Sequence, residues 1–291
     1  MKREWLVWFG KGLVMGVADA VPGVSGGTMA LITGIYERLV SALAHLHPRL
    51  LLLLWQGRWA EFWVRIDGAF LLSLGLGILV SLFSVLNLVH WMLEGAPQLL
   101  WSFFLGLIVA SLFTLGIRHR WCRLDILLCG IGTVIAVGLS LLTEMAMTVN
   151  AWTLILGGAI AISAMLLPGI SGSFILLLMG LYPAVVAAVH QRDLVTIGLV
   201  ALGCIIGLLV FSRFLNALLQ RWHDRVLAFM LGFILGATVK VWPWQYQQQW
   251  LSPFEFTQLS GQPSLLPGAL AMMLLGAIAV VGLTRHSQQK S

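Results

Sequence analysis

The sequence predicts an all-α polytopic membrane protein of two inverted repeats, each a broken helical hairpin plus three transmembrane helices. Three observations support this fold class. The 291 residues are 59% hydrophobic and only 10% charged, with a mean hydropathy of +0.95, whereas soluble domains carry about a quarter charged residues. Apolar runs of about 20 residues, the length that spans ~30 Å of hydrocarbon, recur along the chain. One helix-breaking motif also occurs twice.

The repeated motif reads ADAVPGVSGGT at residues 18–28 and AMLLPGISGSF at residues 164–174. The shift along the chain that superposes these two stretches also aligns Tyr36 with Tyr182. Proline cannot donate a backbone N–H and moves the preceding residue out of helical geometry. We therefore expect a half-helix to end before each Pro-Gly pair, and Ser25 and Ser171 to cap the half-helix that follows.

The motif interrupts two apolar regions, residues 5–44 and 151–190. Non-helical backbone survives at membrane depth only where it is buried in protein or faces water. Each region is either two crossings or a re-entrant hairpin that enters and leaves on one side, and we expect the re-entrant form. The plainer alternative is that Pro and Gly only kink two ordinary helices, which the duplication disfavours. Each hairpin contributes an even number of crossings.

The remaining elements follow in order and divide between the two repeats. In the first repeat, residues 1–121, the hairpin 5–44 precedes an interfacial segment at 46–66 and helices at 68–90 and 98–117, and residues 122–143 supply its third crossing. In the second repeat, residues 151–291, the hairpin 151–190 precedes helices at 194–212, 226–242 and 265–284. The Trp and Arg content of the interfacial segment suits a membrane surface.

Similarity between FFLGLIVAS at 103–111 and FMLGFILGA at 229–237 extends the repeat beyond the hairpins. Three crossings per repeat are an odd number, so the second copy must enter the membrane inverted. Inverted repeats with discontinuous helices are typical of secondary transporters. With the N-terminus inside, all of the 17 Lys and Arg residues except Arg192 and Lys240 lie on or toward the cytoplasmic side. The positive-inside rule therefore predicts that both termini are cytoplasmic.

Several other classes of function are disfavoured by the residues. The three cysteines are isolated, with no CxxC spacing and no His at ligand distance in the sequence, so they indicate neither a metal site nor a disulfide framework. The stretch GVSGG at 23–27 matches the nucleophile pattern of serine hydrolases, but it lacks the preceding strand and the Asp and His partners. The net charge of +6 is explained by cytoplasmic loops rather than by a nucleic-acid partner. We expect no enzyme, no cofactor and no metal.

The broken hairpins supply the candidate binding residues. Free N–H groups and the positive dipole end of a half-helix form an anion site, and two inverted copies would converge near the bilayer centre. The candidates in the two motifs are Ser25, Gly26, Gly27, Thr28, Ser171, Gly172 and Ser173.

Four charged residues have two interpretations each. Lys240 either snorkels to the interface or holds an anionic headgroup, and Arg213 either obeys the positive-inside rule or contacts the same anion. Asp19, whose counterpart in the second motif is Met165, either couples transport to protons or sodium or serves as a cap or ion-pair partner. Glu37 either lies at the cytoplasmic mouth and takes part in ion coupling, or is an ordinary interfacial residue.

The stretches ADAVPGVSGGTMALITGIYERLVSAL, LLPGISGSFILLLMGLY and LGFILGATVKVWPWQ resemble the bacterial undecaprenyl phosphate translocases of the PopT type, and the resemblance runs end to end. It implies a multi-pass protein of the bacterial cytoplasmic (inner) membrane. It also implies transport of undecaprenyl phosphate from the periplasmic to the cytoplasmic leaflet, for reuse in peptidoglycan and other envelope polymers.

The residues suit such a polyprenyl-phosphate partner, because the tail can stay among the membrane lipids while the headgroup needs a polar path. We expect alternating access, in which the two repeats exchange which side is open. The alternative is a secondary transporter or channel for a small soluble anion; a phosphatase or transferase acting on the same lipid would need a nucleophile or metal cluster. A homo-oligomer is compatible with the sequence, which does not fix the number of subunits.

Overall fold

The computed structural model describes residues 2–20, 25–46, 50, 53, 55–142, 147–247 and 249–288. Its first half contains α1 (Lys2–Asp19), α2 (Gly26–Ile32), α3 (Tyr36–Ala44), α5 (Trp59–Arg65), α6 (Gly68–Gly95), α7 (Pro97–Arg118) and α8 (Arg123–Leu141). Its second half contains α9 (Ala151–Leu166), α10 (Gly172–Leu178), α11 (Tyr182–Gln191), α12 (Leu194–Ala237), η1 (Thr238–Val241), β1 (Gln245–Tyr246), β2 (Gln249–Trp250), α13 (Pro253–Ser260) and α14 (Leu266–Gln288).

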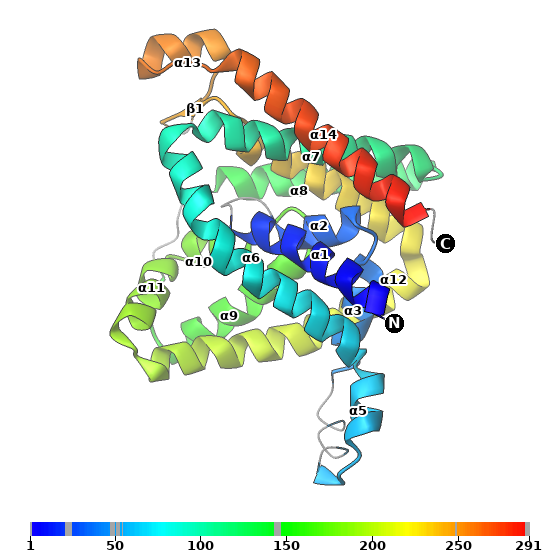
Figure 1. The fold of residues 1–291 in the computed structure, drawn as a ribbon. Coiled ribbons are helices and arrows are strands. Elements are labelled where there is room, and N and C mark those ends of the chain that lie inside the picture. Colours follow the sequence, from blue (N-terminus) through cyan, green and yellow to red (C-terminus); the bar gives the residue numbers. More distant parts are fainter. Residues whose placement is uncertain are drawn as a thin grey trace.

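The fold is that of a multi-pass, all-α membrane protein, with one short antiparallel hairpin of β1 and β2. Within the described residues, four helices are long and apolar enough to cross a membrane, and the bent pair α10–α11 raises the number to five. In Figure 1, α13 and β1 lie at one end of the molecule and α5 projects from the opposite end. The predicted fold class is confirmed at this level.

Each of the two broken apolar regions folds into three helices rather than two half-helices. In the first region α2 and α3 follow α1, and in the second region α10 and α11 follow α9. The turn after the short middle helix contains a glycine of positive φ in both cases, Gly34 (71°) and Gly180 (70°). The axes of α10 and α11 differ by 110°, a geometry that suits either a broken span or a re-entrant loop.

The breaks themselves lie near the predicted positions. Helix α9 ends at Leu166, and its C-cap Leu167 is extended (φ −80°, ψ 128°) directly before Pro168, as expected for a residue that precedes proline. Helix α1 ends at Asp19. Pro22 and Gly23 lie outside the described residues, as do residue 143 of the predicted third crossing and residues 47–49, 51, 52 and 54 of the predicted interfacial segment.

The predicted helices 194–212 and 226–242 correspond to two helical segments, both within α12, that meet at a kink. Trp222 has non-helical dihedrals (φ −138°, ψ 47°) at their junction. The second segment ends at Ala237 and continues as the single 3₁₀ turn η1.

Close helix pairs depend on glycine. A Cβ on Gly106 of α7 would lie 2.0 Å from the carbonyl oxygen of Met273 on α14, and a Cβ on Gly232 of α12 would lie 1.9 Å from that of Cys129 on α8. Glycine at Gly77 likewise allows α6 to approach α1, because a Cβ there would lie 2.2 Å from the Phe9 carbonyl. Small residues at such contacts are typical of membrane helices, where backbones associate by close packing.

Candidate functional site

The two motifs meet in the structure. The N–H of Gly169, in the second motif, donates to Oγ1 of Thr28 in the first motif at 2.9 Å. The hydroxyl of Tyr36 donates to the carbonyl of Leu166, at the end of α9, at 2.7 Å. A Cβ on Gly27 would lie 3.0 Å from the carbonyl oxygen of Met165, so glycine lets α2 approach the end of α9. The start of α2 therefore packs directly against the break in the second region.

In the first motif, the backbone N–H groups at the start of α2 already donate to side chains of the protein itself. Oδ1 of Asp19 accepts from the N–H of Gly26 at 2.7 Å. Ser25, which is 1% exposed, caps α2 by accepting from the N–H of Gly27 at 3.1 Å. At the other end of α2, the ammonium of Lys11 donates to the carbonyl of Thr33 at 2.6 Å. In this conformation Asp19 therefore serves as a cap, one of the two interpretations that its position allowed.

The second motif is arranged differently. Met165 stands where the first motif has Asp19, and the Ser171 hydroxyl pairs with that of Ser173 at 2.7 Å instead of capping α10. Ser171 lines a small cavity of ≈ 20 Å³ together with Lys240 and Phe174. The ammonium of Lys240 lies 3.0 Å from the centroid of the Phe174 ring, a cation–π contact. The structure thus brings the predicted residues Ser171 and Lys240 into one cavity.

Lys240 also lines a larger cavity of ≈ 180 Å³, which we name the vestibule. The vestibule lies between the start of α7, η1, the strand β1 and α13. Its lining consists of amide, aromatic and proline residues around one lysine: Pro97, Gln98, Trp101, Lys240, Trp242, Pro243, Gln245, Tyr246, Phe256 and Gln262. None of the described residues that line the vestibule or the small cavity is acidic. Lys240 is therefore a cation shared by two adjoining cavities.

The sequence indicated Lys240 but not the rest of the vestibule. Gln98 and Trp101 belong to α7, more than 130 positions away along the chain, and each is an ordinary residue for the end of a membrane helix. The signal that was visible is the run of Trp, Pro and Gln after Lys240, which marks a membrane interface.

Arg213 and Glu37 lie elsewhere. A guanidinium nitrogen of Arg213 donates to the carbonyl of Leu46 at 2.9 Å, and Oε1 of Glu37 lies 2.7 Å from Nε2 of His223, one residue after the kink in α12. Neither Arg213 nor Glu37 is among the described residues that line the two cavities. In this conformation these two candidates join α3 and the segment after it to α12.

Arg192, the other basic residue predicted to lie outside, precedes a helix cap. The carboxylate of Asp193 accepts from the hydroxyl of Thr196 at 2.6 Å and from the N–H of Val195 at 3.0 Å. These hydrogen bonds, led by that from the Thr196 hydroxyl, hold the pKa of Asp193 below its ordinary value. Asp193 is thus committed to capping α12.

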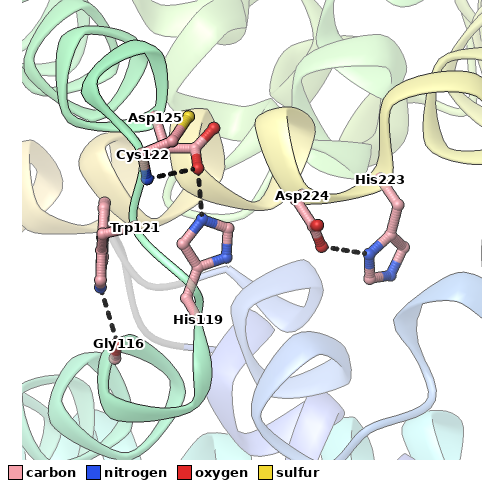
Figure 2. Close-up of polar contacts among 7 residues, drawn as sticks. All are labelled: Gly116, His119, Trp121, Cys122, Asp125, His223 and Asp224. Atoms are coloured by element: carbon pink, nitrogen blue, oxygen red, sulfur yellow. Dashed lines mark hydrogen bonds and ion pairs between the residues drawn. The ribbon is translucent and has the colours of Figure 1, made fainter.

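A separate polar cluster closes the turn between α7 and α8. Figure 2 shows one oxygen of Asp125 between the ring of His119, at 3.2 Å, and the N–H of Cys122, at 3.1 Å. The indole of Trp121 donates to the carbonyl of Gly116 at 2.8 Å. Across the described part of the chain, no group of three His, Cys, Asp or Glu residues is arranged to hold a metal. The cluster fixes a helix start.

Comparisons with known proteins identify similar chains. The model of the undecaprenyl phosphate translocase-like family matches residues 15–257. A protein of Vibrio cholerae named polyprenyl-phosphate transporter is 40% identical over 303 aligned residues, which cover 98% of each chain. A Staphylococcus aureus protein of the same name is 29% identical over 255 residues, 80% of this chain and 84% of that protein. No solved structure gives a significant match.

Proposed function

Because the chain belongs to the undecaprenyl phosphate translocase-like family, and is therefore a transporter and not an enzyme, we propose that its substrate is undecaprenyl phosphate. It moves this lipid from the periplasmic to the cytoplasmic leaflet of the bacterial inner membrane. The returned carrier lipid then serves peptidoglycan and other envelope synthesis. Both termini face the cytoplasm, as the distribution of Lys and Arg requires.

The observation that carries this function is the position of Lys240. Its ammonium is half-buried, touches the Phe174 ring, and has no described carboxylate as partner. A charge that is removed from water without a counter-ion is costly, and a cation–π contact returns only about 0.5–2 kcal/mol. A phosphate headgroup would supply the missing counter-ion, while its isoprenoid tail stays in the bilayer.

The headgroup is bound where the two motifs meet. On the side of the second motif, Ser171, Ser173 and Lys240 offer hydroxyl and ammonium donors, and Gly172 lets the start of α10 approach the Ala161 carbonyl of α9. On the side of the first motif, the N–H groups of residues 26 and 27 become available when Asp19 and Ser25 release them. The stretch from Ser25 to Thr28 then completes the site.

The two repeats are inverted, and they exchange the side to which this site is open. Support for the repeat comes from the close helix pairs, since Gly106 and Gly232 hold the same position in FFLGLIVAS and FMLGFILGA. Each of these glycines contacts the third crossing of the other repeat, at Met273 and at Cys129 respectively. Exchanging the repeats turns one contact into the other, as expected for a two-fold relation between the halves.

Transport by the purified protein in liposomes tests the function. Labelled undecaprenyl phosphate is placed in one leaflet, and its appearance in the other is followed with time. We expect flipping in the wild type, at least a tenfold loss when Ser25 and Ser171 are both replaced by Ile, and no loss for Ser84→Ile, because Ser84 is exposed and bonds only within its own helix. Wild-type protein that fails to move the lipid would contradict the proposal.

The same assay separates lipid transport from transport of a small soluble anion. A lipid translocase should lose its rate when the isoprenoid tail is shortened to a few carbons and should tolerate millimolar inorganic phosphate. An anion transporter should be insensitive to the tail and inhibited by free phosphate. Recovery of the labelled lipid with its phosphate intact confirms that no bond is broken.

A further inference from the structure

The volumes of the vestibule and the small cavity determine which ligand each can hold. A buried water needs a cavity of about 10–15 Å³, so the ≈ 20 Å³ beside Ser171 accommodates about one water. A phosphate group has five non-hydrogen atoms, and it does not fit there in this conformation. The vestibule, with ≈ 180 Å³, has room for a phosphate group and several waters.

The vestibule also contains an amide donor. The Gln98 side chain is only 2% exposed, and no hydrogen bond joins it to another residue of the described chain. Gln98 lines the vestibule, so its amide is available to donate to the acceptor oxygens of a ligand in that space.

Other vestibule residues favour an anionic ligand. Lys240 is the charged residue among those that line the vestibule. Pro97, the first residue of α7, lines it too, as do Gln98 and, one turn later, Trp101. The positive end of this 22-residue helix therefore faces the same space. Gln245 plays a different part, since its amide donates to the carbonyls of Lys240 at 3.0 Å and Trp242 at 2.9 Å. It fixes the turn that holds the lysine.

We propose that the vestibule is a separate capture site for the phosphate monoester headgroup of the lipid, which is held there by Lys240 and Gln98 before it reaches Ser171. This inference rests on the proposed transport function. Because Lys240 lines both cavities, rotation of its flexible side chain transfers the headgroup from the vestibule to the small cavity. The first binding event therefore takes place at the start of α7, not at the repeated motifs.

Photo-crosslinking in liposomes tests the capture site. The photoreactive residue p-benzoylphenylalanine replaces Tyr246, which lines the vestibule, and in a matched control it replaces Tyr182, which is similarly exposed (40% against 38%) but lines neither cavity. The probe is ³²P-labelled undecaprenyl phosphate. We expect label on the protein from position 246 and at least fivefold less from position 182.

Variants then separate the two sites. In the Tyr246 background, Ser171→Ile should abolish transport but leave crosslinking within twofold of its starting value. Gln98→Leu should lower crosslinking at least fivefold and raise the lipid concentration needed for half-maximal transport. Gln98→Glu keeps the shape of the side chain and places a negative charge in the vestibule, so it tests the same prediction if Gln98→Leu fails to elute as folded protein.

Competition distinguishes the lipid headgroup from free phosphate. Unlabelled undecaprenyl phosphate should suppress crosslinking at concentrations at least tenfold below those of inorganic phosphate, and undecaprenol, which lacks the phosphate, should not compete. Equal potency of inorganic phosphate would overturn the lipid capture role, as would loss of crosslinking in Ser171→Ile or unchanged crosslinking in both Gln98 variants. A wild type that transports but does not crosslink refutes this inference alone, whereas one that does neither refutes the proposed function as well.

Discussion

Replacing Thr28 by valine tests whether the two motifs are held together as described. The Thr28 side chain is 2% exposed, and its hydroxyl oxygen accepts the N–H of Gly169 at 2.9 Å. Valine has nearly the same shape but no acceptor, so the substitution removes one hydrogen bond between segments 141 positions apart without creating a cavity. The N–H of Gly169 is left without its partner.

The size of the effect follows from that unpaired donor. Gly169 is half-buried, and a hydrogen bond of this kind contributes about 0.5–1.5 kcal/mol, which corresponds to a roughly 2- to 12-fold change in the folding equilibrium at about 1.4 kcal/mol per factor of ten. For chains of this general size, each kcal/mol lowers the midpoint of thermal unfolding by roughly 2–4 °C. We therefore expect a clear decrease in the midpoint measured in detergent.

The matched control is Thr114→Val. Thr114 is half-buried and its hydroxyl donates to the carbonyl of Ala110 in its own helix at 2.7 Å, so valine leaves no N–H unpaired, and we expect a change within about 0.5 kcal/mol. Thr28→Ser retains the acceptor and should lose only the methyl contribution of about 0.8 kcal/mol. If Thr28→Val unfolds at the same temperature as Thr114→Val, the contact between the motifs does not contribute to stability and the reasoning is wrong.

Three further predictions concern other residues. Tyr36→Phe leaves the carbonyl of Leu166 without its donor and should lower stability by about 0.5–1.5 kcal/mol in the same unfolding measurement; an unchanged midpoint would refute that bond. Gly106→Ala places a methyl 2.0 Å from a backbone oxygen and should cost about 1–3 kcal/mol, whereas Gly198→Ala, with nothing within 4 Å, should be neutral or stabilising by up to about 1 kcal/mol; equal effects would contradict the helix contact. Asp19→Asn keeps an oxygen for the N–H of Gly26 but cannot bind a proton or neutralise a cation, so flipping in liposomes should lose its dependence on a proton or sodium gradient; if that dependence is unchanged, Asp19 has no coupling role.

Part of the candidate site could be predicted from the sequence because its motif occurs twice. The Pro-Gly-x-Ser-Gly pattern indicated Ser25 and Ser171, and the lysine on the outer side of the predicted topology indicated Lys240. The capping role of Asp19 was only one of two interpretations. Its carboxylate lies seven residues before Gly26 and reaches the N–H of that residue only if the chain turns back between them. No feature of the sequence near Gln98 indicated its role, since its burial beside the vestibule depends on tertiary packing.

The sequence by itself determined the class of the protein and the two regions where helix must break, but not the third helix in each broken region nor α13. The class and the breaks are consequences of local chemistry: apolar length sets the crossings, and proline and glycine set the breaks. The tertiary structure decided that the two segments of α12 meet at a kink at Trp222, that Thr28 pairs with Gly169, and that Lys240 lines two cavities. Each of these features depends on contacts between segments that are distant in the chain. Helix packing brings such segments together, and their local sequence does not determine it.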